Sequence, residues 1–182
     1  MSPQCNAEPI VSSTSGIDFG DAPDDPNVPD DYPTYVESHG AWHTIVHNVY
    51  LGAGVDSDEE PQASENAAGD DTFDGNDDED GILLQSSLRR GTPCEIQVIA
   101  SIDGYLDAWM DFNADHDWDD PGEQVLVSVR LAEGGNRLTI AIPADATPGV
   151  AFARFRFSTW GGLFPDGGAP DGEVEDYRFV IR

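Results

Sequence analysis

The chain has 182 residues, with 36 acidic against 8 basic side chains, so its formal net charge at pH 7 is −28. A field of this sign repels nucleic acid and anionic membrane surfaces, which excludes both as expected partners. The length suffices for one domain with a buried core. No apolar run approaches the length of a membrane span, so we expect no membrane insertion.

The acidic residues are unevenly distributed along the chain. All basic residues are arginines and the first is Arg89, so residues 1–88 carry 20 acids and no base. A high-salt habitat and the binding of several divalent cations would both account for such an excess. Scattered acids are expected in the first case, whereas here the acids cluster with Gly and Asn in short runs, which favours cations.

The N-terminal half shows little regular pattern. Residues 1–16 are small and polar, and we expect a disordered tail. Residues 17–81 are expected to form the acidic, loop-rich part of a single domain that continues to residue 182. No signal peptide is visible, yet we expect a secreted or cell-surface protein, because weak acid-rich sites suit extracellular calcium. A disulfide between Cys5 and Cys94 and two free thiols are both open alternatives.

Residues 41–51 are β-branched and aromatic, and they predict a strand. His39, His43 and His47 are spaced four apart, which on a helix would place them on one face as a zinc site. Residues four apart on a strand are separated by about 13 Å, so one ion could not join them. We therefore expect ordinary strand histidines.

Residues 54–81 form an acidic stretch in which oxygen side chains recur at every second position of its later part. The composition is typical of a disordered linker, whereas the spacing predicts a loop ordered by a metal ion, and both interpretations stay open. The candidate ligands of this loop are Asp74, Asn76, Asp78 and Asp80.

Regular β patterns begin at residue 82 and continue to the end of the sequence. Turn signals at intervals of about 8–12 residues predict an antiparallel β-sandwich of the jelly-roll or immunoglobulin-like type, with little or no helix. Phe155 and Phe157 alternate with Arg154 and Arg156, so the phenylalanine face is expected to be the core face. The predicted strands are 82–85, 93–101, 104–111, 124–131, 136–142, 150–158 and 173–182.

The strongest site signal is the acidic segment between the predicted strands 104–111 and 124–131. Oxygen side chains occupy every second position from Asp111 to Asp119, and Glu123 follows a Pro-Gly turn. Ca²⁺ takes about six to eight oxygen ligands, which alternating carboxylates on a tight loop can supply. An EF-hand loop differs, since it has Gly where this chain has His116 and its last Glu one position earlier. We predict a calcium loop between two strands, with a solvated acidic turn as the alternative. Its candidate ligands are Asp111, Asn113, Asp115, Asp117, Asp119 and Glu123.

A third acidic cluster opens the last predicted strand. The ends of a domain often lie close together, so these acids could surround an ion with two aspartates of the N-terminal segment. Solvated carboxylates are the alternative. The candidate ligands are Asp18, Asp21, Glu173, Glu175 and Asp176.

Several segments together resemble the bacterial GEVED domain, and they follow the family's order over about residues 17–182. The resemblance implies a β-sandwich module of secreted or surface proteins, often one part of a long multidomain chain, that binds calcium and is not an enzyme. The segments are Asp18–Pro23, Gly69–Asp71, Asp78–Gly81, Trp109–Asn113, Gly122–Glu123, Arg154–Arg156 and Gly172–Tyr177.

The residues favour a binding or structural role over catalysis. No nucleophile–base or zinc-protease motif is present, and the many carboxylate pairs are uninformative, so we expect no enzyme. The leading interpretation is a calcium-stabilised structural or adhesion module that binds more than one ion and is monomeric when isolated. Its candidate partners are a surface glycan or another surface protein. Loss of calcium is expected to loosen residues 54–81 first.

The alternative is a carbohydrate-binding module. Four tryptophans are many for this length, and Trp118 lies inside the acidic loop, where an exposed ring could stack on a sugar. The opposite expectation is that Trp109 belongs to the core and that the others are partly buried edge residues. These others are Trp42, Trp118 and Trp160.

Overall fold

The computed structural model of the chain describes residues 16–25, 27–28, 31–69 and 79–182. Strands dominate these residues, and the helical structure found in them is a single 3-10 turn, η1 (Val36–Ser38). The all-β class expected from the sequence is therefore confirmed. The strands are β1 (Ile17–Phe19), β2 (Trp42–Thr44), β3 (Ile82–Leu84), β4 (Pro93–Ala100), β5 (Gly104–Met110), β6 (Gln124–Leu131), β7 (Gly134–Ala141), β8 (Gly149–Ser158), β9 (Gly168–Ala169) and β10 (Glu173–Ile181).

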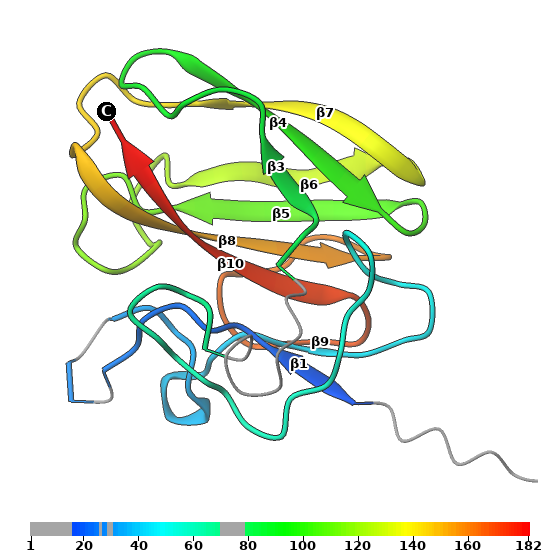
Figure 1. Cartoon of the computed structure of the whole chain (residues 1–182). Helices are drawn as coiled ribbons and strands as arrows, with labels where there is room; N and C mark the ends of the chain where they lie inside the picture. Colours follow the sequence, from blue (N-terminus) through cyan, green and yellow to red (C-terminus); the bar gives the residue numbers. More distant parts are fainter. Residues whose placement is uncertain (1–15, 26, 29–30, 70–78) are drawn as a thin grey trace, which may run out of the picture.

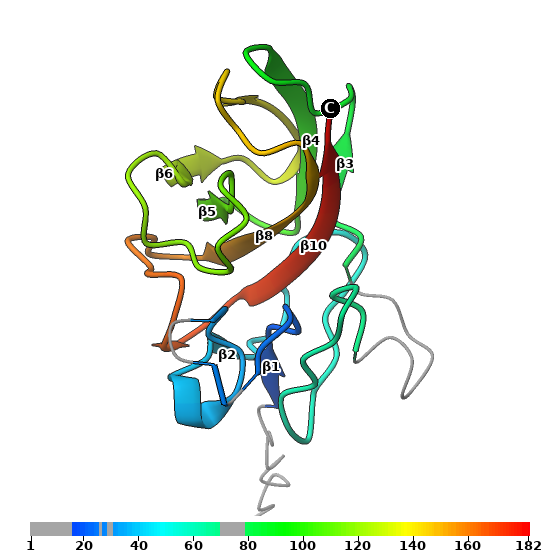
Figure 2. The same ribbon diagram turned by 90° about the vertical axis from the view of Figure 1, so that its left-hand side faces the viewer.

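Two antiparallel sheets face each other as in a β-sandwich (Figure 1, Figure 2). One sheet has four strands in the order β10-β8-β5-β6, and the other has three in the order β3-β4-β7. These seven strands match the seven predicted from residue 82 onward, and no end differs by more than two residues. Turn chemistry and apolar alternation were therefore sufficient to locate them.

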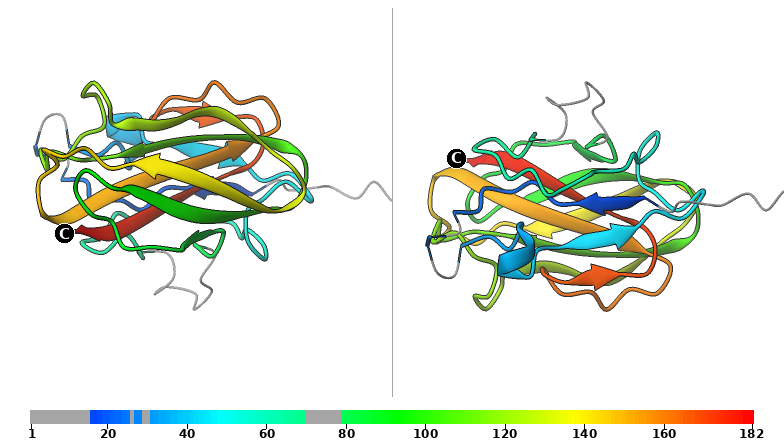
Figure 3. Two further views of the ribbon diagram at one scale, coloured as in Figure 1. Left: turned by 90° about the horizontal axis from the view of Figure 1, so that it is seen from above. Right: turned by 90° about the horizontal axis from the view of Figure 1, so that it is seen from below.

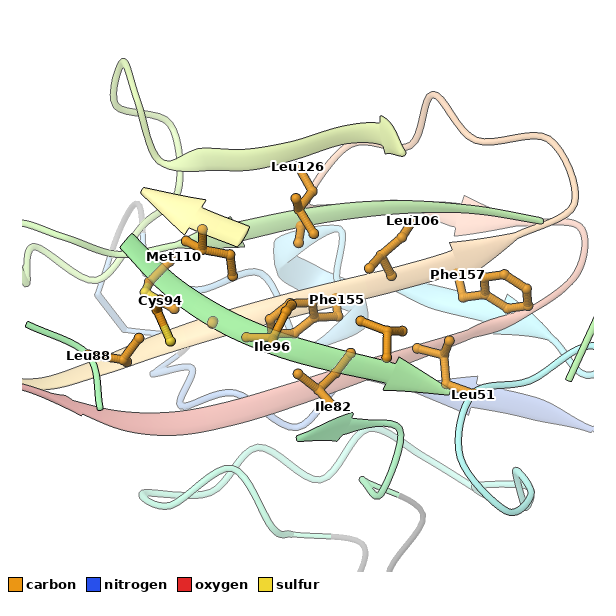
Figure 4. Packing of buried hydrophobic residues seen from close by; sticks show 14 of the residues in the cluster. Leu51, Ile82, Leu88, Cys94, Ile96, Leu106, Met110, Leu126, Phe155 and Phe157 are labelled. Atoms are coloured by element: carbon orange, nitrogen blue, oxygen red, sulfur yellow. The ribbon is translucent and has the colours of Figure 1, made fainter. Parts of the chain in front are cut away.

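The inner faces of the two sheets enclose the main hydrophobic core (Figure 4). Phe155 and Phe157 of β8 are fully buried in it, as their alternation predicted. Ile96 of β4 and Leu106 of β5 show that both sheets contribute side chains. Each fully buried side chain of this size stabilises the fold by about 1.5–3 kcal/mol relative to its exposed state.

A small third sheet lies against the outer face of β8 and β10 (Figure 2) and is seen from its own outer side in Figure 3 (right). Its strand order is β1-β2-β9, with β1 antiparallel and β9 parallel to β2. The four-stranded sheet is thus the middle of three layers. Consequently Arg154 and Arg156, on the face of β8 opposite its core phenylalanines, are also buried, with exposed fractions of 0% and 1%.

The N-terminal part departs from the predicted strand at residues 41–51. Only Trp42–Thr44 is a strand there, because a turn follows in which Val49 N–H donates to the Val46 carbonyl. Asn48 adopts a left-handed φ of 66° within that turn. Asn is one of the few residues that tolerates this conformation, so a sequence rich in β-branched residues still leaves the strand here.

Cys94 is fully buried on β4, and its thiol donates a hydrogen bond to the Ser86 carbonyl. Cys5 lies outside the described residues, so a disulfide and two free thiols both stay open. The tail expected at residues 1–16 stays a prediction, because residues 1–15 are also outside the described part of the chain. Over the described part of the chain, no helix has the length and apolar character needed to cross a membrane.

Candidate metal centre

Three carboxylates converge in the loop that joins β5 to β6. One oxygen each of Asp111, Asp115 and Glu123 lies within 4.8 Å of the others. The antiparallel pairing of β5 with β6 causes this convergence, because Met110 N–H donates to the Glu123 carbonyl at 2.9 Å and closes the base of the loop. Residues twelve apart in the sequence thereby become neighbours. The acidic loop lies between two strands, as expected, and calcium binding by it stays a prediction.

Asp111 organises the first half of this loop. Its Oδ1 accepts N–H groups of Asn113 at 3.1 Å and Ala114 at 2.6 Å, so the chain turns back around the carboxylate. Its Oδ2 accepts the Tyr32 hydroxyl at 2.5 Å and the His116 N–H at 3.2 Å. Tyr32 belongs to the N-terminal segment, and burial together with the Asp111 carboxylate raises the pKa of its hydroxyl. The hydroxyl therefore stays protonated and acts as the donor.

Glu123 is the member of the cluster with a buried oxygen that lacks a hydrogen-bond partner. Its Oε1 accepts the Phe112 N–H at 2.9 Å, whereas Oε2 is buried with no hydrogen-bond partner among the described residues. The residue is only 3% exposed. Burial, with the charges of Asp111 and Asp115, raises the pKa of Glu123 to about 7. A buried carboxylate oxygen without a donor costs free energy, and a cation at this point would remove that cost.

His116 takes the backbone conformation that glycine has in an EF-hand loop. Its φ is 77°, and Ala114 nearby has a φ of 63°. Left-handed backbone costs a non-glycine residue about 1–2 kcal/mol. The His116 ring stacks on the Tyr32 ring, with centroids 5.7 Å apart and planes at 20°, and this contact offsets part of the cost.

The other predicted ligands of the loop line two different cavities. Asn113 Nδ2 donates to Asp115 at 2.7 Å and to Asp120 at 2.6 Å, and Asn113, Asp120 and Glu123 line a cavity of about 280 Å³. Asp120 was missed because it breaks the alternate spacing, although its place before a Pro-Gly turn was visible. Asp117 and Asp119 instead line a different cavity, and burial raises the pKa of Asp117.

A family comparison bears on this site. Residues 105–180 match the family model of the GEVED domain. The GEVED resemblance is confirmed over this part of the chain. The matched region runs from β5 into β10 and includes the acidic loop and both buried arginines. Searches among curated proteins and among solved structures found no match.

The acids of residues 172–176, the Gly-Glu-Val-Glu-Asp segment at the head of β10, accept hydrogen bonds from backbone N–H groups of the N-terminal half. The chain ends do meet here, as expected: Asp176 Oδ2 accepts the N–H groups of Asp21 and Ala22, both at 2.9 Å. Asp18 Oδ2 accepts the Val174 N–H at 2.7 Å in return. Glu173 and Glu175 accept the N–H groups of two further loop residues, Leu51 and Gly81.

The predicted metal site at the chain ends stays a prediction. Within the residues that the structure describes, the loop cluster is the one group of three or more His, Cys, Asp or Glu close enough to share an ion. The Arg154 guanidinium donates to the Asp176 carboxylate at 2.6 and 2.8 Å. The GEVED acids thus connect the last strand to the N-terminal layer.

The predicted ligands in residues 54–81 are only partly described. Asp74, Asn76 and Asp78 lie outside the described residues, so this loop remains a prediction. Asp80 Oδ1 accepts the Ala53 N–H at 2.9 Å.

The three spaced histidines have separate environments. His39 ends η1, His47 is exposed in the turn after β2, and His43 of β2 is fully buried. His43 Nδ1 donates to the Asp171 carbonyl at 2.7 Å, and Nε2 accepts from Arg156 Nε at 3.0 Å. Burial and the charge of Arg156 hold the pKa of His43 well below its usual value.

The tryptophans divide into two buried and two exposed rings. Trp109 and Trp118 are 3% and 4% exposed, whereas Trp42 and Trp160 are 38% and 79% exposed. The alternative with an exposed Trp118 is therefore wrong. The opposite expectation is correct for the buried Trp109, but Trp118 is more buried and Trp160 more exposed than a partly buried edge residue. The Trp118 ring is covered by the Arg154 guanidinium, 4.7 Å from the ring centroid.

Proposed function

We propose that the chain is a non-catalytic, calcium-binding and calcium-stabilised structural or adhesion module of a larger secreted or cell-surface protein. The observation that carries this proposal is the buried, unpartnered Glu123 Oε2 beside Asp111 and Asp115. A divalent cation would satisfy several carboxylates together and would also offset the repulsion between their charges.

The donor chemistry of the loop favours calcium over softer metals. The three converging groups are all carboxylates, and hard cations such as Ca²⁺ prefer oxygen ligands. Asp111, Asp115 and Glu123 would hold the ion, with Asn113 and Asp120 close enough to assist through their contacts with Asp115. The bound ion would supply the positive charge that this group of acids lacks.

An ion in this loop would also stabilise distant parts of the chain. Asp111 accepts the Tyr32 hydroxyl, and the Tyr32 ring packs against Trp118 and Phe152, with centroids 4.6 and 5.4 Å away. Fixing the Asp111 carboxylate therefore fixes one contact between the middle sheet and the N-terminal segment. Such coupling supports a role in which calcium stiffens the module.

The test is calorimetric titration of chelator-treated protein with Ca²⁺, with thermal melts at each addition. Saturable binding and a rise in Tm are expected for the natural chain. Glu123→Gln should weaken binding about tenfold or more, because it removes one ligand charge. The same variant should raise the Tm of the calcium-free protein, because it removes a buried unpaired charge.

The matched control is Glu133→Gln, in which an exposed glutamate of the β6–β7 turn is neutralised. This variant should bind calcium as the natural chain does. The absence of saturable binding at millimolar calcium, or equal losses in both variants, would contradict the proposal.

Carbohydrate binding has less support. It relied on an exposed ring next to the acidic loop, and Trp118 is buried. The exposed rings of Trp42 and Trp160 lie away from the cluster of Asp111, Asp115 and Glu123, since neither lines the cavity beside it.

A further inference from the structure

Two cavities share a wall beside the third sheet. A cavity of about 430 Å³ lies over β1 and β2, and one of about 380 Å³ lies next to the 117–119 segment. Both are lined in part by η1 and by residues 164–167. In Figure 3 (right) η1 appears as the short helical turn beside the small sheet. We call this pair of cavities the two-cavity surface.

The two cavities differ sharply in charge. Ile17, Val36 and Trp42 line the first, and none of its described lining residues is acidic. The Trp42 ring rests on the backbone of Gly168, where a Cβ atom would stand 2.1 Å from the ring. The second is lined by the exposed Phe164 ring and by four aspartates. These are Asp31, Asp117, Asp119 and Asp166.

The buried arginines fix the backbone of the common wall through hydrogen bonds from the protein interior. Arg154 Nη1 donates to the carbonyls of Pro33 and Pro165 at 2.5 and 2.8 Å. Arg156 Nη1 donates to the carbonyls of Phe164 and Asp166, both at 2.7 Å. A surface fixed in this way loses little conformational entropy when a partner binds.

The wall also carries apolar side chains that remain in water. Val36 is 69% exposed and Phe164 is 73% exposed, although the backbone that holds each is fixed by hydrogen bonds. Exposed apolar groups on a preorganised surface gain free energy when a partner covers them.

We propose that the two-cavity surface binds an extended segment of a partner protein that carries an apolar side chain and, near it, an arginine. The apolar side chain enters the cavity over Trp42. The guanidinium enters the acidic cavity, where it stacks on the Phe164 ring and donates to the aspartates. The net charge of −28 further attracts a basic partner. This inference goes beyond the proposed function and requires no metal ion.

The test uses labelled peptides with one leucine and one arginine, separated by glycine spacers of increasing length, in fluorescence anisotropy with and without calcium. At least one spacing should bind, and its affinity should fall as salt rises. Replacing the arginine by citrulline, which has nearly the same shape and no charge, should weaken binding about tenfold. Val36→Asp and Asp166→Arg should each weaken it by a similar factor.

Two matched controls separate this surface from general effects. Val127 of β6 is 66% exposed and lines neither cavity, so Val127→Asp should leave the affinity unchanged. Trp160 is 79% exposed in the same loop as Phe164, so Trp160→Ser should bind normally where Phe164→Ser does not. All five substituted positions are exposed, so these changes should leave the Tm unaltered.

Three results would overturn the inference. They are equal binding of the arginine and citrulline peptides, equal effects of Val36→Asp and Val127→Asp, and no binding of any peptide at millimolar concentration. Neutral oligosaccharides that bind in place of the peptides, with loss in Val36→Asp, would assign the surface to a glycan. Calcium titration of the same samples keeps the outcome separate from that of the metal proposal.

Discussion

Arg154 uses every one of its donors although it is fully buried. Its Nε and Nη2 donate to the Asp176 carboxylate at 2.8 and 2.6 Å. The remaining N–H groups reach the Thr34 hydroxyl and the carbonyls of Pro33 and Pro165. A guanidinium has five N–H groups in a fixed planar arrangement, so this site is specific for arginine.

We therefore expect Arg154→Lys to be strongly destabilising. Lysine has three donors and no planar fork, so at least two of the five buried hydrogen bonds of Arg154 would be lost. The expected loss is about 3–5 kcal/mol of unfolding free energy, measured by urea unfolding at constant calcium. Arg130→Lys is the control, since Arg130 pairs with Asp103 at the exposed surface and should change stability by less than about 1 kcal/mol. Equal losses of unfolding free energy in the two variants would show that the buried hydrogen bonds of Arg154 contribute nothing extra to stability.

Arg156 differs because its five N–H groups all reach uncharged acceptors. Its Nε donates to His43, and the other four groups donate to carbonyls of the segments that cover it. The imidazole can accept this hydrogen bond only while Nε2 is unprotonated. The carbonyls belong to Trp42, Phe164, Asp166 and Gly167.

The neutral state of His43 gives the fold a predictable dependence on pH. The folded-state pKa lies well below the usual 6.5, so below about pH 6.5 the unfolded chain takes up a proton that the folded chain does not. Stability from this group is present above pH 6.5 and is lost as the pH falls, by up to about 1.4 kcal/mol per pH unit. His43→Gln should show a smaller loss in unfolding free energy between pH 6.5 and 5 than the natural chain. His47→Gln, at an exposed site, should keep the natural slope, and a natural slope in both variants would refute the assignment.

At the residue scale the sequence indicated which carboxylates come together and missed their environments. Asp111, Asp115 and Glu123 converge because a tight loop between paired strands must bring its ends together, and their role as metal ligands stays a prediction. Nothing near position 111 in the sequence indicates Tyr32, since that contact spans 79 residues. The burial of Arg154 was also not predictable, because charged side chains are rarely buried unless paired and the pairing is itself a result of the fold.

At the scale of elements, every strand of seven residues or more was predicted, and so was the short β3, whereas β1 and β9 were missed. Seven or more alternating positions distinguish a strand from its surroundings, whereas β1 has three residues and β9 has two. Such short strands exist because their neighbours hold them. Trp42 of β2, for example, lies over Gly168 of β9, and only glycine leaves room for the ring.

Gly168→Ala should therefore disturb the third sheet. The added Cβ would stand 2.1 Å from the Trp42 ring, so the ring must move. We expect a loss of about 1–3 kcal/mol, typical of overpacking, and a change in near-ultraviolet circular dichroism. Gly54→Ala is the control, because nothing lies within 4 Å of a Cβ there. An unchanged spectrum in Gly168→Ala would show that the Trp42 ring does not depend on Gly168.

At the scale of the whole molecule, the proposed calcium loop and the N-terminal layer meet at Tyr32. Removal of calcium should therefore expose the N-terminal part of the chain to proteases before the sandwich itself. The sequence placed the first opening at residues 54–81, and the Tyr32 contact adds the segment around residue 32. Limited proteolysis with and without chelator, with mass spectrometry of the first fragments, measures this directly.

Tyr32→Phe distinguishes coupling from a general loss of stability. Phenylalanine keeps the ring stacking and removes the hydroxyl that donates to Asp111. We expect this variant to bind calcium and to show a smaller difference in protease resistance between its two states than the natural chain. Equal protection with and without chelator in the natural chain would contradict the role of calcium in rigidity.

The contacts between the first and last strands also set an order of folding. Asp176 binds the N–H groups of Asp21 and Ala22 across 155 and 154 residues, and Val174 binds Asp18 across 156. Contacts so distant in sequence form late, since closing long loops costs entropy before any contact forms. A ribosome therefore releases the N-terminal segment long before the strand that anchors it exists. During synthesis this acidic, lysine-free segment stays exposed to solvent until β10 has been made. Its high charge keeps it from aggregating during that time.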